Sequence, residues 1–167
     1  MIKKILSVVS ALVLSTSLAI AQVIPIGGGG SSIAQTTGTC TPTIYGSTTP
    51  GTSTYVTRQC SYIKTGDEVT VNIFVRGTLG GTAAGDVMIG GLPFTIYNTD
   101  PDISCAFSSG RFVTLTASYT QIGIFGIINT TTLSLYQTGS NQLELPIPIT
   151  GWGTNAFVKF TCTYRAA

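Results

Sequence analysis

The chain has 167 residues, of which only 8% are charged: eight Lys and Arg, six Asp and Glu, and no His. The basic residues are scattered, which excludes the clustered positive charge of a nucleic-acid-binding surface. The absence of histidine removes the commonest general base and disfavours most acid–base catalysts.

The first residues predict export. Lys3 and Lys4 precede an apolar stretch over residues 5–20. Ala19-Ile20-Ala21 then supplies the small residues of a cleavage site after Ala21. A retained membrane anchor is the alternative, but the stretch falls short of a typical span of ~20 residues. Cleavage of a signal peptide over 1–21 would remove two basic and no acidic residues. The remaining chain would then have six of each and a formal charge of zero.

Residues 22–39 predict a flexible tail. Glycines and serines fill positions 27–32, and threonines and glycine follow, so little apolar area is available to offset the entropy of ordering. The apolar start at 23–26 is either a frayed terminus or a peptide that docks on a partner. Residues 40–167 are enough for one domain but hardly for two.

Four cysteines lie in the exported part of the chain: Cys40, Cys60, Cys105 and Cys162. An even number of cysteines in an oxidising compartment favours two disulfides. Structural zinc is the alternative, but it normally takes closely paired cysteines or a cysteine–histidine mixture. Four cysteines allow three pairings, and their spacing does not choose among them.

From Cys40 onward the pattern predicts short strands, because β-type runs alternate with Gly, Pro, Asn and Asp and no window has a helical period. The clearest strand covers 68–75, with apolar residues at every second position. A strand over 55–63 precedes it, and the link at 64–67 has the residues of a tight turn. We therefore expect these two strands to form an antiparallel hairpin.

Seven later runs complete about nine predicted strands. They cover residues 86–89, 94–98, 103–107, 112–119, 122–128, 132–137 and 156–164. In the last run, alternate apolar residues put Cys162 on the buried face. With no crossover helices, the pattern predicts an all-β, antiparallel β-sandwich of jelly-roll-like type as a single domain over 40–167. A closed up-and-down barrel is the alternative.

The run at 122–128 is apolar on both faces. It is either a central buried strand or half of a subunit interface, and we favour the interface. The residues predicted to form that interface are Ile122, Ile124, Phe125, Ile127 and Ile128.

The chain offers few groups for chemistry. Its six carboxylates could in principle form the acid and base pair of a glycoside hydrolase, but most fall in predicted turns or at strand ends. Asp100 and Asp102 flank Pro101 and are weak calcium candidates, since two ligands are too few for this ion. We therefore predict no enzyme activity, no metal and no cofactor.

Exposed aromatic residues are the other route to a binding site. Trp152 stands between two glycines, and together with Tyr136 it is a candidate for ligand binding in a groove. The alternative, which we favour, is that the indole ring closes one end of the β-sandwich.

Several short segments together resemble a small β-sandwich domain of bacteriophage structural proteins, especially the distal parts of tail fibres. They span residues 41–164. The segments are Thr41-Pro42-Thr43 with Gly46, Thr49-Pro50-Gly51 with Tyr55, Tyr62-Ile63-Lys64 with Gly66 and Val69, Gly90-Gly91-Leu92-Pro93-Phe94-Thr95, and the strand from Phe160 to Tyr164.

The resemblance implies a homotrimeric, jelly-roll-like virion component that binds a receptor on a host surface, with no catalytic residues. Because first and last strands of jelly rolls often lie side by side, it suggests pairing Cys40 with Cys162 and Cys60 with Cys105. The protein is then secreted, periplasmic or on the cell surface, or on the virion if a phage encodes it. The leader and the cysteines favour the alternative of a secreted bacterial carbohydrate-binding or extracellular-matrix module.

Overall fold

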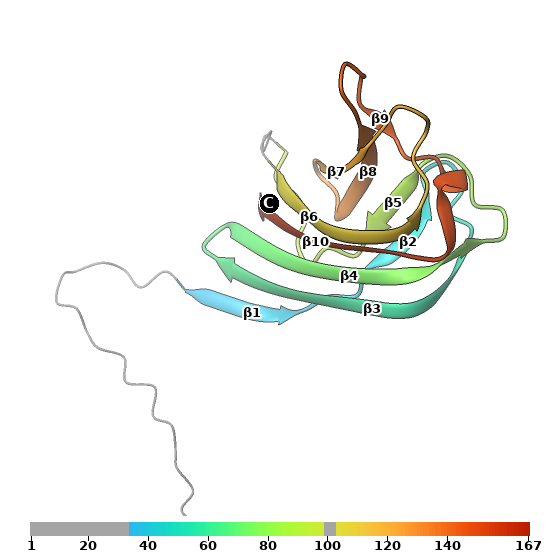
Figure 1. The fold of residues 1–167 in the computed structure, drawn as a ribbon. Coiled ribbons are helices and arrows are strands. Elements are labelled where there is room, and N and C mark those ends of the chain that lie inside the picture. The colour runs from blue at the N-terminus through green and yellow to red at the C-terminus, as the bar shows by residue number, and fades with distance from the viewer. Residues whose placement is uncertain (1–33, 99–102) are drawn as a thin grey trace, which may run out of the picture. The chain divides into compact units, whose positions relative to one another are not determined.

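A computed structural model describes residues 34–98 and 103–167 (Figure 1). The predicted signal peptide, most of the predicted tail and the calcium candidates Asp100 and Asp102 lie outside the described residues. The elements are β1 (Gln35–Thr39), β2 (Thr43–Gly46), β3 (Thr52–Thr65), β4 (Glu68–Gly80), β5 (Val87–Gly90), β6 (Ser104–Val113), β7 (Gln121–Ile127), β8 (Thr132–Thr138), β9 (Leu145–Pro146), the 3-10 turn η1 (Ile149–Gly151) and β10 (Trp152–Arg165).

These strands form two antiparallel sheets. Sheet A has the order β1-β3-β4-β10-β6, and sheet B has the order β2-β5-β8-β7 with β9 paired to β8. The all-β sandwich expected from the strand pattern is confirmed, with ten strands in the described residues where about nine were predicted. The described residues include no helix long and apolar enough to cross a bilayer.

The predicted hairpin is confirmed and is the longest pairing of sheet A. Figure 1 shows β3 and β4 as long, curved neighbours, and their register closes with Thr65 opposite Glu68. Gly66 in the turn has φ +59°, a left-handed conformation that glycine adopts without steric cost. The turn therefore fixes the register from which the rest of the sheet extends.

The core lies between the sheets and is built from alternate residues. β4 and β10 place four apolar pairs opposite one another on the inner face of sheet A: Val69 with Tyr164, Val71 with Cys162, Ile73 with Phe160, and Val75 with Val158. Sheet B covers them with its own buried residues, which include Ile44, Ile89, Ile124, Leu133 and Leu135. The predicted inward face of the last strand, with Cys162 on it, is confirmed.

The predicted tail ends earlier than expected. Residues Gln35–Thr39 form β1, which pairs with β3 from Gln35 opposite Thr65 to Thr39 opposite Ser61, so extending the tail to residue 39 was wrong. β1 is an edge strand whose side chains are mostly exposed. Backbone hydrogen bonds order such a strand, which is why its polar composition gave no sign of it.

Two predicted strand boundaries are also wrong. Residues 94–98 form no strand, because Ile96 N–H donates to the carbonyl of Thr130 beside sheet B while Tyr97 N–H donates to that of Arg165 on sheet A. The runs predicted at 103–107 and 112–119 are joined, since β6 continues through Gly110 and ends at Val113. A Cβ atom at Gly110 would lie 2.9 Å from the Phe107 ring, so glycine here makes room for packing and marks no turn.

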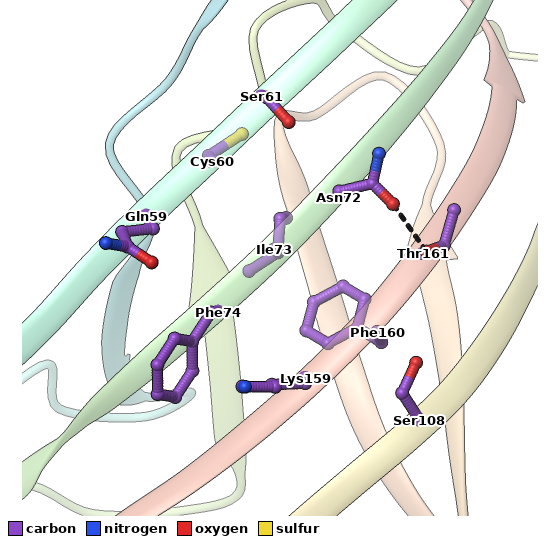
Figure 2. A pocket seen from close by; sticks show the side chains of 10 residues that line it. All are labelled: Gln59, Cys60, Ser61, Asn72, Ile73, Phe74, Ser108, Lys159, Phe160 and Thr161. Atoms are coloured by element: carbon purple, nitrogen blue, oxygen red, sulfur yellow. Dashed lines mark hydrogen bonds between the residues drawn. The ribbon is translucent and has the colours of Figure 1, made fainter.

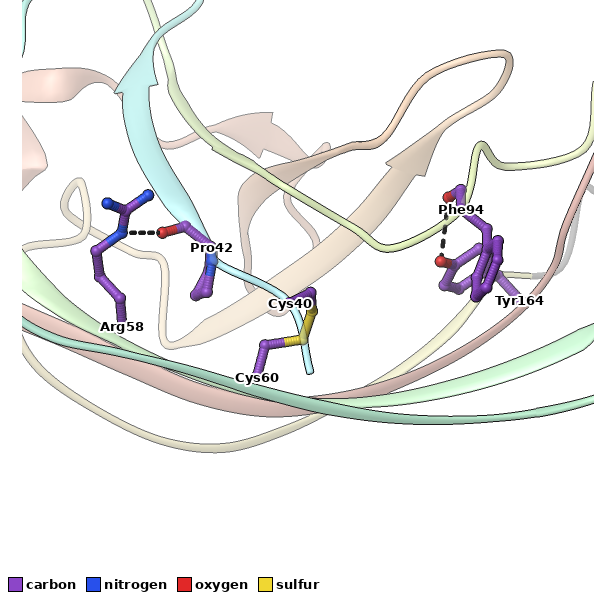
Figure 3. The surroundings of a disulfide bond; sticks show 6 residues. All are labelled: Cys40, Pro42, Arg58, Cys60, Phe94 and Tyr164. Carbon is purple, nitrogen blue, oxygen red and sulfur yellow. Dashed lines mark hydrogen bonds between the residues drawn. A yellow bond between two sulfur atoms is a disulfide. The ribbon is translucent and has the colours of Figure 1, made fainter. Parts of the chain in front are cut away.

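The disulfides join Cys40 to Cys60 and Cys105 to Cys162. The suggested pairs, Cys40 with Cys162 and Cys60 with Cys105, are wrong. β1 and β10 are separated by β3 and β4, so they lie roughly 14 Å apart at ~4.8 Å per strand, beyond the reach of a disulfide. Instead Cys105 stands directly opposite Cys162 on neighbouring strands, and Cys40 follows β1 beside Cys60 on β3 (Figure 3).

Removal of the Cys105–Cys162 bond by the double replacement Cys105→Ala/Cys162→Ala should lower the free energy of unfolding by about 4 kcal/mol. The bond links residues separated by 57 positions, and such a link restricts the unfolded chain strongly. Urea unfolding of the oxidised protein measures the loss. A peptide map without reduction checks the pairing, and a peptide joining Cys40 to Cys162 would contradict the structure.

Tyr164 is buried at the end of the core, and its hydroxyl donates to the carbonyl oxygen of Phe94 at 3.1 Å (Figure 3). Desolvation by burial raises the pKa of this phenol from 10.0 to about 12, because the charged phenolate would lose its hydration in the core. The folded protein therefore holds this proton more tightly than the unfolded chain does.

The contribution of Tyr164 to the free energy of unfolding should therefore be fully present below pH 10. It should fall as the pH rises from 10 toward 12. The expected loss is of the order of 2 kcal/mol. The Tyr164→Phe variant should lose about 1 kcal/mol at pH 8, because the hydrogen bond is gone, yet decline less steeply in alkali. Urea unfolding at pH 8 and pH 11.5 compares the two proteins, and parallel losses would contradict this assignment.

Candidate functional site

The described residues bring together no group of three or more Cys, Asp or Glu side chains able to hold a metal ion. The carboxylates that the structure describes are Asp67 and Glu68 at the β3–β4 turn, Asp86 before β5, and Glu144 before β9. These positions follow the turns and strand ends expected from the sequence. The candidate sites are instead two groups of side chains, one on the outer face of each sheet.

Trp152 does not offer a ring to a ligand. Its side chain is 6% exposed, and Nε1 donates to the carbonyl oxygen of Gly77 at 3.1 Å. The alternative interpretation, that the indole closes one end of the β-sandwich, agrees with this burial. Tyr136 lies on the outer face of sheet B, because its neighbours Leu135 and Gln137 point inward. The structure thus does not place Trp152 and Tyr136 in one groove.

The outer face of sheet B carries a row of large side chains across four strands. The register places Tyr45 of β2 opposite Met88 of β5, Met88 opposite Ser134 of β8, and Ser134 opposite Phe125 of β7. Met88 and Ser134 are only 9% and 7% exposed although they point away from the core. Larger neighbours on the same face therefore cover them.

Two further residues extend this row. Tyr136 packs edge-on against Phe125 with ring centroids 4.9 Å apart, and Ile127 lies two residues beyond Phe125 on the same face. The Tyr45 hydroxyl is 2.8 Å from the Thr132 hydroxyl, which ties the far end of the row to β8. We refer to Tyr45, Met88, Phe125, Ile127 and Tyr136 as the sheet B strip.

The predicted interface residues divide between two faces. Ile124 is 5% exposed and belongs to the core, and Ile122 also faces inward, opposite Gln137. Phe125 belongs to the strip and is 40% exposed, and Ile128 follows the strand and is 47% exposed. β7 lies at the edge of sheet B, so the alternative of a central buried strand is wrong. One apolar face of β7 packs into the core, and the other belongs to the sheet B strip.

A second candidate surface is a shallow trough of about 410 Å³ on the outer face of sheet A (Figure 2). The inward-facing residues Cys60, Ile73 and Phe160 also contribute to its lining. The outward side chains come from four neighbouring strands and are mainly amides and hydroxyls: Gln59, Ser61, Asn72, Phe74, Ser108, Lys159 and Thr161. A surface with so many donors and acceptors suits a polar ligand.

The trough is ordered by contacts among its own side chains. The Thr161 hydroxyl donates to Asn72 Oδ1 at 2.7 Å. The Lys159 ammonium lies 4.4 Å from the centre of the Phe74 ring, toward which it points in Figure 2. Phe74 in turn meets the Phe157 ring edge-on at 5.7 Å. One cation and two rings therefore support one another at one end of the trough.

Cross-strand register adds two more cations beside these rings. Phe157 of β10 stands opposite Arg76 of β4 on one side and Arg111 of β6 on the other. The Arg111 guanidinium lies 4.4 Å over the ring of Phe112, which is 53% exposed. Sequence reasoning treated these basic residues as scattered and missed the group, because only the pairing of distant strands assembles it.

The comparisons with known proteins bear on the fold. No protein-family model matches the chain, and no curated protein matches it. Among solved structures, the chain is similar to the Dettilon tailspike protein (gp208), with a TM-score of 0.61 and 14% sequence identity. The similarity covers 79% of this chain but only 24% of the tailspike. The chain thus shares its fold with a part of a phage tail protein, which agrees with the coarser part of the resemblance seen in the sequence.

Proposed function

We propose that this protein is an exported, non-enzymatic structural or attachment protein that assembles with copies of itself and contacts a host or cell surface. The fold shared with part of a phage tailspike supports a role of this kind. The predicted leader and the two disulfides support a location outside the cytoplasm, either secreted, periplasmic or at the cell surface, or on a virion.

The sheet B strip is the observation that carries the self-assembly part. Tyrosine, phenylalanine and methionine are enriched in protein interfaces, and the strip presents all three beside one another. No charged residue occupies an outward position of β2, β5, β7 or β8. The strip continues to the edge strand β7, where Phe125 and the adjoining Ile128 remain substantially exposed.

The occupant that fits this surface is a second copy of the same chain. An uncharged apolar face is complementary to itself, and a mature chain of zero formal charge adds no electrostatic repulsion between copies. A homotrimer, with β7 of each copy at the shared contact, is the assembly we propose from the resemblance to tail-fibre domains.

A secreted carbohydrate-binding or extracellular-matrix module is the second candidate function. The trough on sheet A favours it, because amide and hydroxyl side chains surround an aromatic ring there. The two functions are compatible, since the strip and the trough occupy different sheets.

Light scattering tests the assembly on the full chain exported through its own leader and purified, oxidised, from the periplasm. We expect the mass of a trimer, and we expect Phe125→Glu to shift the mass to that of a monomer, because a charge would be buried at the contact. Val56→Glu is the matched control, since Val56 is also an exposed apolar residue, at 57%, but belongs to β3. Val56→Glu should leave the trimer intact.

A wild-type protein that is monomeric at all concentrations would sink the self-assembly proposal. A trimer that survives Phe125→Glu while Val56→Glu disrupts it would show that sheet A forms the contact instead. Circular dichroism confirms that each variant remains folded before its mass is interpreted.

A further inference from the structure

We propose that the outer face of sheet A binds an acidic polysaccharide. In this arrangement the trough holds a sugar ring, and Arg76, Arg111 and Lys159 hold its carboxylate groups. The inference deepens the surface-contact part of the proposed function and is independent of self-assembly.

The three cations converge because of strand register. Arg76 and Arg111 flank Phe157 from the two strands on either side of β10, so their Cα atoms are about 10 Å apart at ~4.8 Å per strand. Lys159 follows Phe157 by two residues on the same face, roughly 7 Å along the strand. A chain with repeated anionic groups can therefore contact more than one cation at once.

Within the described residues, no carboxylate pairs with any of these three cations. The ion pair found there joins Arg165 to Asp67 at 3.9 Å, at the opposite end of sheet A. The acidic residue on β4, Glu68, is eight residues from Arg76, which corresponds to about 26 Å along a strand. The face therefore has a positive end that attracts an anion and a balanced end that does not.

Contacts with rings and backbone already hold the cations in place. Lys159 lies over Phe74, Arg111 lies over Phe112, and Arg76 Nε donates to the carbonyl of Asn155 at 3.4 Å. Ordering side chains before binding lowers the entropy that a ligand must overcome. These contacts leave ammonium and guanidinium donors available, because a cation over a ring face keeps its N–H groups free for an anion.

The lining of the trough favours a sugar over other polyanions. Amide and hydroxyl side chains both donate and accept hydrogen bonds, as sugar hydroxyls require, and the apolar C–H face of a sugar can pack on the Phe74 ring. A nucleic acid carries one charge per phosphate and is bound by many clustered cations, whereas this group has three. An acidic polysaccharide matches both parts of this surface. Its hydroxyl groups fit the amides and hydroxyls of the trough, and its carboxylates fit the three cations.

Affinity electrophoresis and calorimetry of the full exported protein test the proposal with three probes: polygalacturonate, neutral dextran and a 20-base-pair DNA duplex. We expect binding to polygalacturonate that weakens as salt is raised, and no comparable binding to dextran or DNA. Arg76→Gln/Arg111→Gln should weaken polygalacturonate binding at least ten-fold. Phe74→Leu should weaken it without changing its salt dependence, because that replacement removes ring contact and no charge.

The matched control is Lys64→Gln/Arg165→Gln, which removes two positive charges from the other end of the sandwich and should leave binding nearly unchanged. Equal binding of dextran, tighter binding of DNA, or an equal loss in the control variant would each overturn the proposal. Light scattering separates the two proposals. A trimer that ignores polygalacturonate contradicts this inference alone, and a monomer that binds it contradicts self-assembly alone.

Discussion

The antiparallel pairing of β4 with β10 is the constraint on which the other features of this protein depend. It continues without interruption from Ala156 opposite Gly77 to Arg165 opposite Glu68. On the inner face this register aligns valines of β4 with the aromatic and apolar residues of β10. On the outer face it sets Arg76 beside Phe157 and Phe74 beside Lys159. A slip of one residue would exchange the two faces, exposing the core and burying the cations.

The two disulfides join neighbouring strands of sheet A on either side of the β4–β10 pair. Cys105–Cys162 joins β6 to β10, and Cys40–Cys60 joins the end of β1 to β3. On sheet B the buried amide of Gln137 has a similar effect on a loop, since it accepts from Thr116 N–H at 2.7 Å and its Nε2 donates to the Thr116 hydroxyl at 3.0 Å. A buried amide with both ends satisfied costs little and ties the β6–β7 segment to β8.

The outer faces of the two sheets have different chemistry, which is why we assign them different partners. The sheet B strip is uncharged and mainly aromatic, and Met88 and Ser134 lie buried among its larger side chains. The trough on sheet A is lined mainly by amide and hydroxyl side chains, and the same face gathers cations and two aromatic rings at one end. A protein that holds its copies together with one face and contacts an acidic surface with the other combines the two proposals, and neither requires a catalytic group.

The sequence by itself determined the all-β class, the β3–β4 hairpin and the inward face of β10, because alternation and turn residues are local signals. It also favoured a buried Trp152 over an exposed one. It did not determine β1, the disulfide pairs or the two surface groups. β1 is held by backbone hydrogen bonds that need no apolar pattern. The pairing of Cys105 with Cys162 and the row of Arg76, Phe157 and Arg111 depend on which distant strands become neighbours and in what register. That choice is made by the packing of the whole core, so only the tertiary structure decided it.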